Sequence, residues 1–289
     1  MKEEPINECP VPSGFLVVIG GHEDRGNGEQ KKDDDNTQRL EVLKSFWSLI
    51  KSDDPVLEIC TTASSEGDEL FDDYVKAFTE IGIRNIGRLH HDEREDVLAD
   101  CEVCIERINK ADAVFFSGGD QLKLTYLYGG TPFLLQLKQR YIHSGLVIGG
   151  TSAGAMALST PMIYAGNKDV QQISGEVKIT TGLEFLKDVC IDTHFVDRSR
   201  FVRMAQVIAT NPTCLGIGIE EDTALVIRNG LEAEVCGSGV VIVIDGQQMG
   251  RSNIAEFGSG ERITIKGLQV DILSKGDSFS IPQTNPPHI

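Results

Sequence analysis

The stretch LVIGGTSAGAMAL, residues 146–158, decides the fold. It begins with an apolar strand, Leu146–Ile148, passes through Gly150–Gly154 with Ser152 at the centre, and ends in the helix-forming run Ala155–Leu158. G-x-S-x-G between a strand and a helix is typical of a nucleophile elbow, a sharp turn that lifts the serine hydroxyl out of the sheet edge. Small neighbours are needed because the backbone passes close to itself there. The stretch predicts a parallel α/β sheet with Ser152 as candidate nucleophile, the alternative being a tight glycine-rich turn or a phosphate-binding one.

Backbone amides beside Ser152 are expected to face a developing oxyanion. Ala153 opens the helix after the serine, where amide groups point outward and favour negative charge. Gly118 and Gly119 end another apolar strand and offer a second amide. The amide of Ala153 and one from Gly118-Gly119 are therefore candidates for the oxyanion hole.

Upstream of the elbow, apolar strands alternate with amphipathic helices. The expected strands are Phe15–Ile19, Val56–Thr61, Arg84–Leu89 and Ala113–Phe116, and the expected helices are Thr37–Lys51, Leu70–Ile81 and Arg94–Lys110. Continuous apolar strands separated by helices indicate a parallel sheet that is covered on both faces. We therefore expect a doubly wound α/β fold.

Downstream of Thr160 the pattern changes to short strands with turn signals. The expected strands are Thr223–Ile227, Val240–Ile244, Ile263–Ile265 and Val270–Leu273, with turns at Arg228-Asn229-Gly230 and Asp245-Gly246. This spacing is typical of antiparallel hairpins, here appended to the C-terminal side of the sheet. Because no interdomain linker interrupts the pattern, we expect one α/β domain over residues 14–280, with a 1–13 extension and a 281–289 tail. The segment His22–Asn36, rich in Asp, Lys and Gly, is expected to be a surface loop without direct chemistry.

The charge balance narrows the partners. The 289 residues contain 27 Lys+Arg and 44 Asp+Glu, a formal net charge of −17. Such an acidic chain lacks the basic footprint that nucleic acids and anionic membrane surfaces require. No apolar run approaches the roughly 18 residues of a membrane span, and Met1–Ser13 has acids and prolines where a signal peptide has a basic start and an apolar stretch. We expect a cytoplasmic protein that binds neither nucleic acid nor membrane.

Cysteine usage predicts neither a disulfide framework nor a metal centre. The seven cysteines are odd in number and scattered. Cys101 and Cys104 form one C-x-x-C inside a helical stretch, whereas a zinc site needs a second ligand pair and a redox site lies at a helix start after a strand. We interpret both as core thiols, and no cofactor or metal is expected.

A nucleophilic serine needs a base, and His194 is the best placed of the six histidines. It closes the apolar run before it, at a strand end where open α/β sheets put their sites. His90 and His91, which begin a loop after a strand, remain alternatives.

The third member of such a relay is a carboxylate that fixes the imidazole tautomer. Glu220 and Glu221 follow an apolar strand, and alternation sends them to opposite faces, so one of the two can point at the site. Asp192 lies two residues before His194 and shares its face, so it is a further candidate. The order Ser152, His194, Glu221 differs from the Ser–acid–His order of α/β-hydrolases.

Three arginines follow the candidate base. Asp197 is expected to cap a helix that runs to about Ala209, with Arg198 in its first turn and Arg200 and Arg203 on one face. Cations at a helix N-terminus oppose the helix dipole, an arrangement worth keeping where they bind carboxylates. The alternative is surface arginines paired with this chain's many acids.

Several motifs together resemble the cyanophycinases, a branch of the serine peptidases related to dipeptidase E. They are Ile19–Asp24, Phe116–Gln121, Gly149–Ala155, Asp192–Phe195 with its following Arg-x-Arg-x-x-Arg, Gly218–Ala224 and Leu273–Phe279. The resemblance runs in order from about Phe15 to Phe279. It implies a flavodoxin-like, class I glutamine-amidotransferase-like fold and an intracellular serine-type exopeptidase. Such an enzyme cuts cyanophycin, a poly-aspartate backbone with arginine on each side chain, into β-Asp-Arg dipeptides.

The resemblance also implies roles for individual residues. Ser152 would be the nucleophile, His194 the general base and Glu221 the orienting acid. The amides of Gly119 and Ala153 would form the oxyanion hole. Substrate-binding positions would be Gln121, Asp192, Arg198, Arg200 and Arg203. The related dipeptidases place the acid between serine and histidine, which makes Asp169 a second candidate for that role. The family further implies a homodimer.

The sequence departs from the family pattern at Thr193, where glutamine is usual, and in a longer loop after Asp24. The missing glutamine carboxamide affects which substrate is expected and does not affect the expectation of hydrolysis. Two other functions are therefore kept beside cyanophycin hydrolysis: a dipeptidase for short aspartyl or isoaspartyl peptides, and a binding protein that has lost its chemistry.

Overall fold

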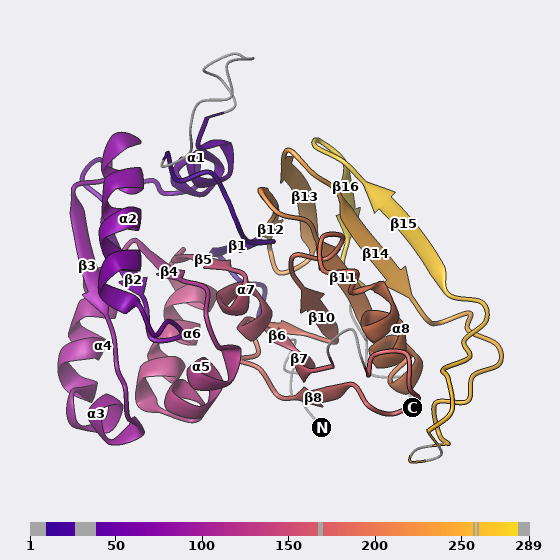
Figure 1. The fold of residues 1–289 in the computed structure, drawn as a ribbon. Coiled ribbons are helices and arrows are strands. Elements are labelled where there is room, and N and C mark those ends of the chain that lie inside the picture. The colour runs from indigo at the N-terminus through magenta and orange to yellow at the C-terminus, as the bar shows by residue number, and fades with distance from the viewer. Residues whose placement is uncertain (1–9, 27–38, 167–169, 257, 259, 283–289) are drawn as a thin grey trace, which may run out of the picture.

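A computed structural model of the chain describes residues 10–26, 39–166, 170–256, 258 and 260–282. Its strands form an eight-stranded sheet, a six-stranded sheet and a two-stranded hairpin, and the two larger sheets lie side by side (Figure 1). Within this part of the chain, the helices are too short or too polar to cross a membrane.

The larger sheet contains the alternating strands expected from the first half of the sequence. Its order is β16-β13-β12-β1-β5-β4-β2-β3. Strands β1, β5, β4, β2 and β3 are parallel, and β12, β13 and β16 are added to β1 by successive antiparallel pairings. The strands are β1 Phe15–Ile19, β2 Val56–Cys60, β3 Asn85–Leu89, β4 Ala113–Phe116, β5 Val147–Thr151, β12 Thr223–Arg228, β13 Glu232–Gly237 and β16 Ser278–Ser280. All five parallel strands end at the same edge of the sheet.

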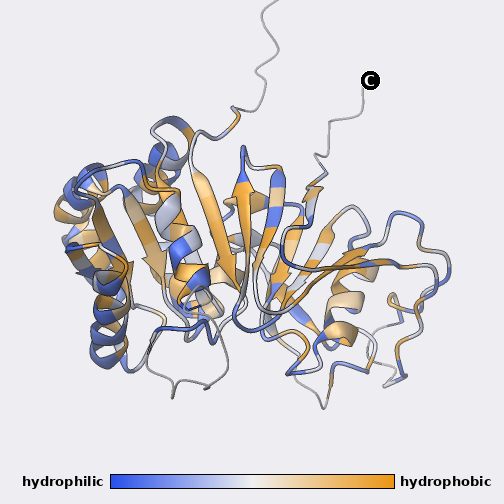
Figure 2. Cartoon of the chain, turned by 90° about the horizontal axis from the view of Figure 1, so that it is seen from above, coloured by the Kyte–Doolittle hydropathy of each residue, from blue (hydrophilic) through white to orange (hydrophobic). Residues whose placement is uncertain are grey.

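Helices cover both faces of this sheet. They are α1 Glu41–Ser48, α2 Gly67–Glu80, α3 Arg94–Ala99, α4 Cys101–Lys110, α5 Gln121–Tyr128, α6 Pro132–His143 and α7 Ala153–Ala157. One more helix, α8 Phe201–Thr210, lies on the second large sheet. Val17 and Ile19 of β1 face one apolar cluster with α1 and α2, and Leu16 and Val18 face another with α4 and α6. Figure 2 shows apolar strands between helices that carry hydrophilic residues on their outer sides. The doubly wound α/β prediction is confirmed.

Where the sequence predicts one helix, the structure has two. The stretch Arg94–Lys110 divides at Asp100 into α3 and α4. Cys104 is buried and Cys101 is partly buried, both as free thiols, and burial raises the pKa of Cys104.

The second sheet was not foreseen. Its order is β15-β14-β11-β10-β6-β9, with β10 and β11 parallel at its centre. The strands are β6 Ser159–Thr160, β9 Leu186–Lys187, β10 Val189–Asp192, β11 Leu215–Ile219, β14 Val241–Asp245 and β15 Gln269–Leu273, and the hairpin is β7 Met162–Ala165 with β8 Lys178–Thr180. Buried side chains of both large sheets belong to one apolar cluster, which joins them.

The C-terminal strands are therefore divided between two sheets rather than appended to one. Strands β12, β13 and β16 extend the first sheet, whereas β14 and β15 extend the second. The prediction of a strand at Ile263–Ile265 is wrong, because Ile265 makes only an isolated bridge with Ser252. Apolar alternation shows that a segment can pair but not which distant strand it pairs with.

Candidate active site

Ser152 lies in the turn between β5 and α7, as the elbow motif predicts. Its backbone has φ 51° and ψ −116°, a sparsely populated conformation for a residue with a side chain. A Cβ on Gly150 would lie 2.8 Å from the carbonyl carbon of Gly154, and one on Gly154 would overlap the carbonyl of Phe116. The two glycines are sterically required, and the turn they permit lifts the Ser152 hydroxyl to the sheet edge.

His194 and Glu221 complete a hydrogen-bonded relay with Ser152. Ser152 Oγ lies 2.9 Å from His194 Nε2, and His194 Nδ1 lies 2.6 Å from Glu221 Oε1. His194 follows β10 and is 3% exposed, whereas Glu221 lies in the turn between β11 and β12. The expected nucleophile, base and acid are thus brought together in the order of a Ser–His–acid relay.

The electrostatics suit proton transfer. Burial lowers the pKa of His194, the hydrogen bond that it donates to Glu221 opposes this, and the charge of Arg198 lowers the pKa further. Burial would raise the pKa of Glu221, but hydrogen bonds from His194 and His22 outweigh it and lower that pKa. At neutral pH the imidazole is neutral and the carboxylate is charged, the states needed to accept the serine proton.

The end of β1 organises the relay through its backbone. The carbonyl of Ile19 accepts from the amide of Ser152 at 3.0 Å, and the carbonyl of Gly20 accepts from that of His194 at 2.8 Å. The carbonyl of Gly21 accepts from the amide of Asp222, next to Glu221, at 2.9 Å. Three consecutive residues therefore fix the three segments that carry the relay.

Ser152 and His194 open into a cavity of about 480 Å³. Three of the residues that line it are acids from α2 and the position just before it, namely Glu66, Glu69 and Asp73. Two cations line the same cavity, Arg25 and Arg198. The cavity thus presents both signs of charge, although the chain as a whole is strongly acidic.

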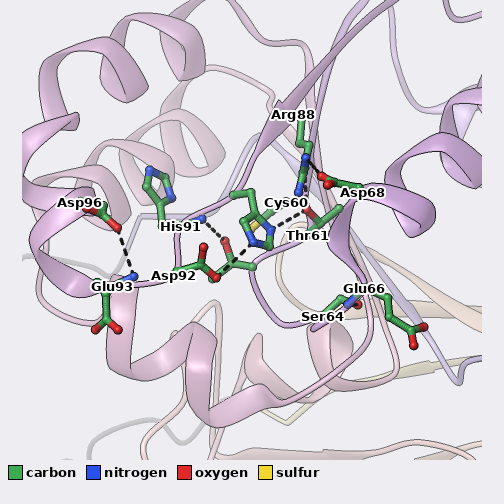
Figure 3. Close-up of polar contacts among 12 residues, drawn as sticks. Cys60, Thr61, Ser64, Glu66, Asp68, Arg88, His91, Asp92, Glu93 and Asp96 are labelled. Carbon is green, nitrogen blue, oxygen red and sulfur yellow. Dashed lines mark hydrogen bonds and ion pairs between the residues drawn. The ribbon is translucent and has the colours of Figure 1, made fainter.

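A polar network holds the loop that carries Ser64 and Glu66. Arg88 Nε donates to Thr61 Oγ1 at 3.1 Å and also pairs with Asp68 (Figure 3). His90 Nδ1 lies 2.9 Å from the same Thr61 Oγ1. Figure 3 shows Ser64 and Glu66 beside this network. His90 is therefore part of a loop-fixing network, and His91 contacts Tyr128 in the core.

The candidate oxyanion residues lie on both sides of Ser152. A Cβ on Gly118 would come within 3.3 Å of Ser152 Cβ, and Gly119 lines the cavity with φ 139°. A side chain at Gly119 would overlap the Ala63 carbonyl, so only glycine fits there. Ala153 opens α7 directly after the serine. Their role in stabilising an oxyanion stays a prediction.

Asp192 is not the acid of the relay, because His194 Nδ1 is bonded to Glu221 and the Asp192 carboxylate is bonded to arginines. It is fully buried and binds Arg203, whose Nε lies 2.5 Å from Oδ2, and Arg200, whose Nη1 lies 3.0 Å from Oδ1. Because a buried carboxylate needs compensating charge, these two arginines are already committed to a carboxylate of their own chain. Of the three expected arginines, the structure places Arg198 at the cavity.

The other residues singled out in the sequence make separate contacts. Gln121 Nε2 donates to the carbonyl of Ile163 at 2.8 Å. Thr193 is fully buried and its hydroxyl has no hydrogen-bond partner among the described residues. Glu220 accepts from the amide of Val240 at 2.9 Å, which leaves Glu221 to face the histidine. Asp169 lies outside the described residues.

The expected helix cap is wrong. The helix begins at Phe201 with Arg200 at its N-cap position, so Asp197 does not cap it and Arg198 is not in its first turn. The intervening residues form turns, and the amide of Arg198 donates to the carbonyl of His194 at 3.0 Å. This turn is what directs Arg198 to the cavity.

Two residues were missed. His22 Nδ1 lies 2.9 Å from Glu221 Oε2, and buried Glu23 accepts from Thr151 Oγ1 at 2.5 Å and from the Tyr74 hydroxyl. These first loop residues contact the relay and the strand that precedes Ser152, and the expectation of a loop without direct chemistry stays a prediction. The signal was available, because they follow a Gly-Gly pair at the carboxyl end of a parallel strand.

One group of metal-type ligands exists within the described part of the chain. Ligand atoms of His22, His194 and Glu221 lie within 4.8 Å of one another. These side chains already satisfy one another by hydrogen bonds, which accounts for their proximity. The absence of a metal requirement stays a prediction.

The fold and site define a class, a serine-type hydrolase on a parallel α/β sheet. Residues 25–234 match peptidase family S51. The chain is 32% identical to the cyanophycinase of Geminocystis herdmanii over 92% of this chain and 93% of that protein, and 33% identical to that of Synechococcus elongatus over 93% and 79%. A solved peptidase from an acI-B1 actinobacterium has the same fold, with a TM-score of 0.65 and 24% identity over 94% of this chain and 98% of that one.

This chain belongs to peptidase family S51. The resemblance to the cyanophycinases is thereby confirmed, and the protein is a serine-type hydrolase.

Proposed function

We propose that this chain is an exopeptidase that hydrolyses cyanophycin to β-Asp-Arg dipeptides, with Ser152 as nucleophile. The observation that carries the proposal is the Ser152–His194–Glu221 relay opening into a cavity with both signs of charge. Ser152 Oγ attacks the carbonyl of the backbone peptide bond while His194 accepts the serine proton. The proton then passes to the leaving amine, and water hydrolyses the acyl ester to restore the serine. Glu221 holds the imidazole in the required tautomer.

The charges of the cavity match the proposed substrate. A β-Asp-Arg unit carries a guanidinium and carboxylates. Glu66, Glu69 and Asp73 suit the guanidinium, and Arg25 and Arg198 suit carboxylates.

The other residues at family substrate positions have a second explanation. Arg200 and Arg203 neutralise buried Asp192, and Gln121 binds a backbone carbonyl. Direct contact of these four residues with substrate, a cytoplasmic location and a homodimer stay predictions.

The test is incubation of the purified chain with cyanophycin and detection of β-Asp-Arg by mass spectrometry. We expect release by the wild type, none by Ser152→Ala, and wild-type release by Ser48→Ala, a control on the surface helix α1. Rates on β-Asp-X and α-Asp-X dipeptides separate the polymer enzyme from an aspartyl dipeptidase. A wild type that is inert on the polymer but cleaves dipeptides would overturn the cyanophycin assignment, and one inert on all three would favour a binding protein.

A further inference from the structure

A second histidine reaches the relay carboxylate. His22 Nδ1 lies 2.9 Å from Glu221 Oε2, while His194 Nδ1 lies 2.6 Å from Oε1. The two imidazole rings meet edge to face with centroids 4.9 Å apart. Each oxygen of the Glu221 carboxylate thus has its own imidazole, and His22 contacts both Glu221 and His194.

Glu221 needs such support because of where it lies. It is in the turn that carries the chain from the second sheet to the first, and its side chain is 27% exposed. Among the described residues, its carboxylate is bonded by His194 and His22. A carboxylate held at one oxygen can still rotate about its last side-chain bond, and a bond at the second oxygen fixes its plane.

The backbone around His22 is tied to the same turn. The carbonyl of Gly21 accepts from the amide of Asp222 at 2.9 Å, and Asp222 Oδ1 accepts from the amide of Asp24 at 3.1 Å. His22 lies between these two connections with φ 48°, in the left-handed region. Its imidazole is therefore presented to Glu221 by a cross-linked pair of turns, although 65% of the side chain is exposed.

We propose that His22 is a positioning residue that orients Glu221, and through it His194, for the reaction. The proposal rests on the proposed function for the identity of the relay. His22 donates the Nδ1 proton to Oε2, which keeps Oε1 aimed at His194 Nδ1–H. Its loss lowers the efficiency of proton transfer from Ser152 without weakening substrate binding.

Two isosteric variants separate this role from backbone effects. Asparagine and aspartate both tolerate positive φ, and their terminal atoms occupy the place of imidazole Nδ1. His22→Asn keeps a donor toward Glu221, whereas His22→Asp puts a second carboxylate there. We expect His22→Asn to keep kcat within about threefold of wild type and His22→Asp to lose about 10- to 100-fold, the range for a hydrogen bond to a charged group. KM should stay within about twofold in both, because the interaction is made with the relay.

A readout independent of the substrate keeps this test separate from that of the proposed function. The rate at which a serine-directed sulfonyl fluoride labels Ser152, followed by intact mass, reports the activation of the nucleophile. We expect the labelling rates to follow the order wild type, His22→Asn, His22→Asp, even if cyanophycin is not cleaved. Equal labelling and equal kcat for the two variants would overturn the positioning role. A loss confined to KM would overturn it as well, because it would place His22 against the substrate.

Discussion

Replacing Gly21 by alanine tests whether the residue that follows β1 determines the position of the His194 ring. The residue has φ 99°, and a methyl group there would lie 3.1 Å from His194 Nδ1 and closer still to Cε1 and Nε2. Ordinary carbon contacts are about 3.5–4.0 Å, so the ring must move by about 1 Å to accommodate the methyl group. Glu221 holds Nδ1 at 2.6 Å on one side, and the 2.9 Å contact with Ser152 is the bond that such a shift breaks.

The expected magnitude follows from that displacement. Misplacing a reacting group by about 1 Å costs on the order of 10²-fold in rate. Alanine at positive φ also costs about 1–2 kcal/mol of stability. Gly21→Ala should therefore remain folded at 25 °C, with a lower Tm and a kcat reduced by about 10²-fold.

Gly276→Ala is the matched control. Gly276 has φ 88°, similar to Gly21, but a Cβ there meets nothing within 4 Å. It should show the same loss in Tm with wild-type kcat and a wild-type rate of Ser152 labelling. If Gly21→Ala keeps kcat within about threefold of this control, contact with Gly21 does not determine the position of the His194 ring.

Two further substitutions test the charges. Arg198→Gln removes a cation that lowers the pKa of His194; because the base must be neutral, activity is lost as pH falls through that pKa, and the acid limb of kcat/KM should shift to higher pH in the variant. An unchanged limb would show that Arg198 does not act on His194. Arg203→Met leaves buried Asp192 undercompensated and should cost about 3–5 kcal/mol in urea unfolding. Arg228→Met, which breaks an exposed pair with Glu234, should cost less than about 1 kcal/mol, and similar losses for both would contradict the buried-pair explanation.

Much of the first sheet is predictable because its signals are local. The apolar runs of β1, β2, β4 and β5 each end in small residues and are followed by helices, so each strand and its direction can be deduced from its own segment. The division of later strands between two sheets depends on pairing across long separations, such as β1 with β12, and no local pattern encodes it.

The relay residues were predictable from chemistry and family resemblance, but their neighbours were not. Arg200 and Arg203 carry the sequence pattern of carboxylate binders, which does not distinguish a substrate's carboxylate from that of Asp192 in the same chain. The burial of Asp192 makes that distinction. His22 was missed because the residues after it are rich in Asp, Lys and Gly, a composition typical of a surface loop. That composition does not show that the first residue of the segment is held at the sheet edge.

The order Ser152, His194, Glu221 along the chain follows from the topology. Ser152 and Gly21 follow β5 and β1, which are adjacent parallel strands of the first sheet. His194 and Glu221 follow β10 and β11, which are adjacent parallel strands of the second. Carboxyl ends of adjacent parallel strands lie side by side, so each sheet brings two of these residues together. The turn containing Glu221 leads from β11 directly into β12, which pairs with β1, and this connection brings the two pairs into contact. The acid therefore follows the histidine in sequence because it lies on the crossover that joins the two sheets, and the relay depends on that crossover being held by the carbonyl of Gly21.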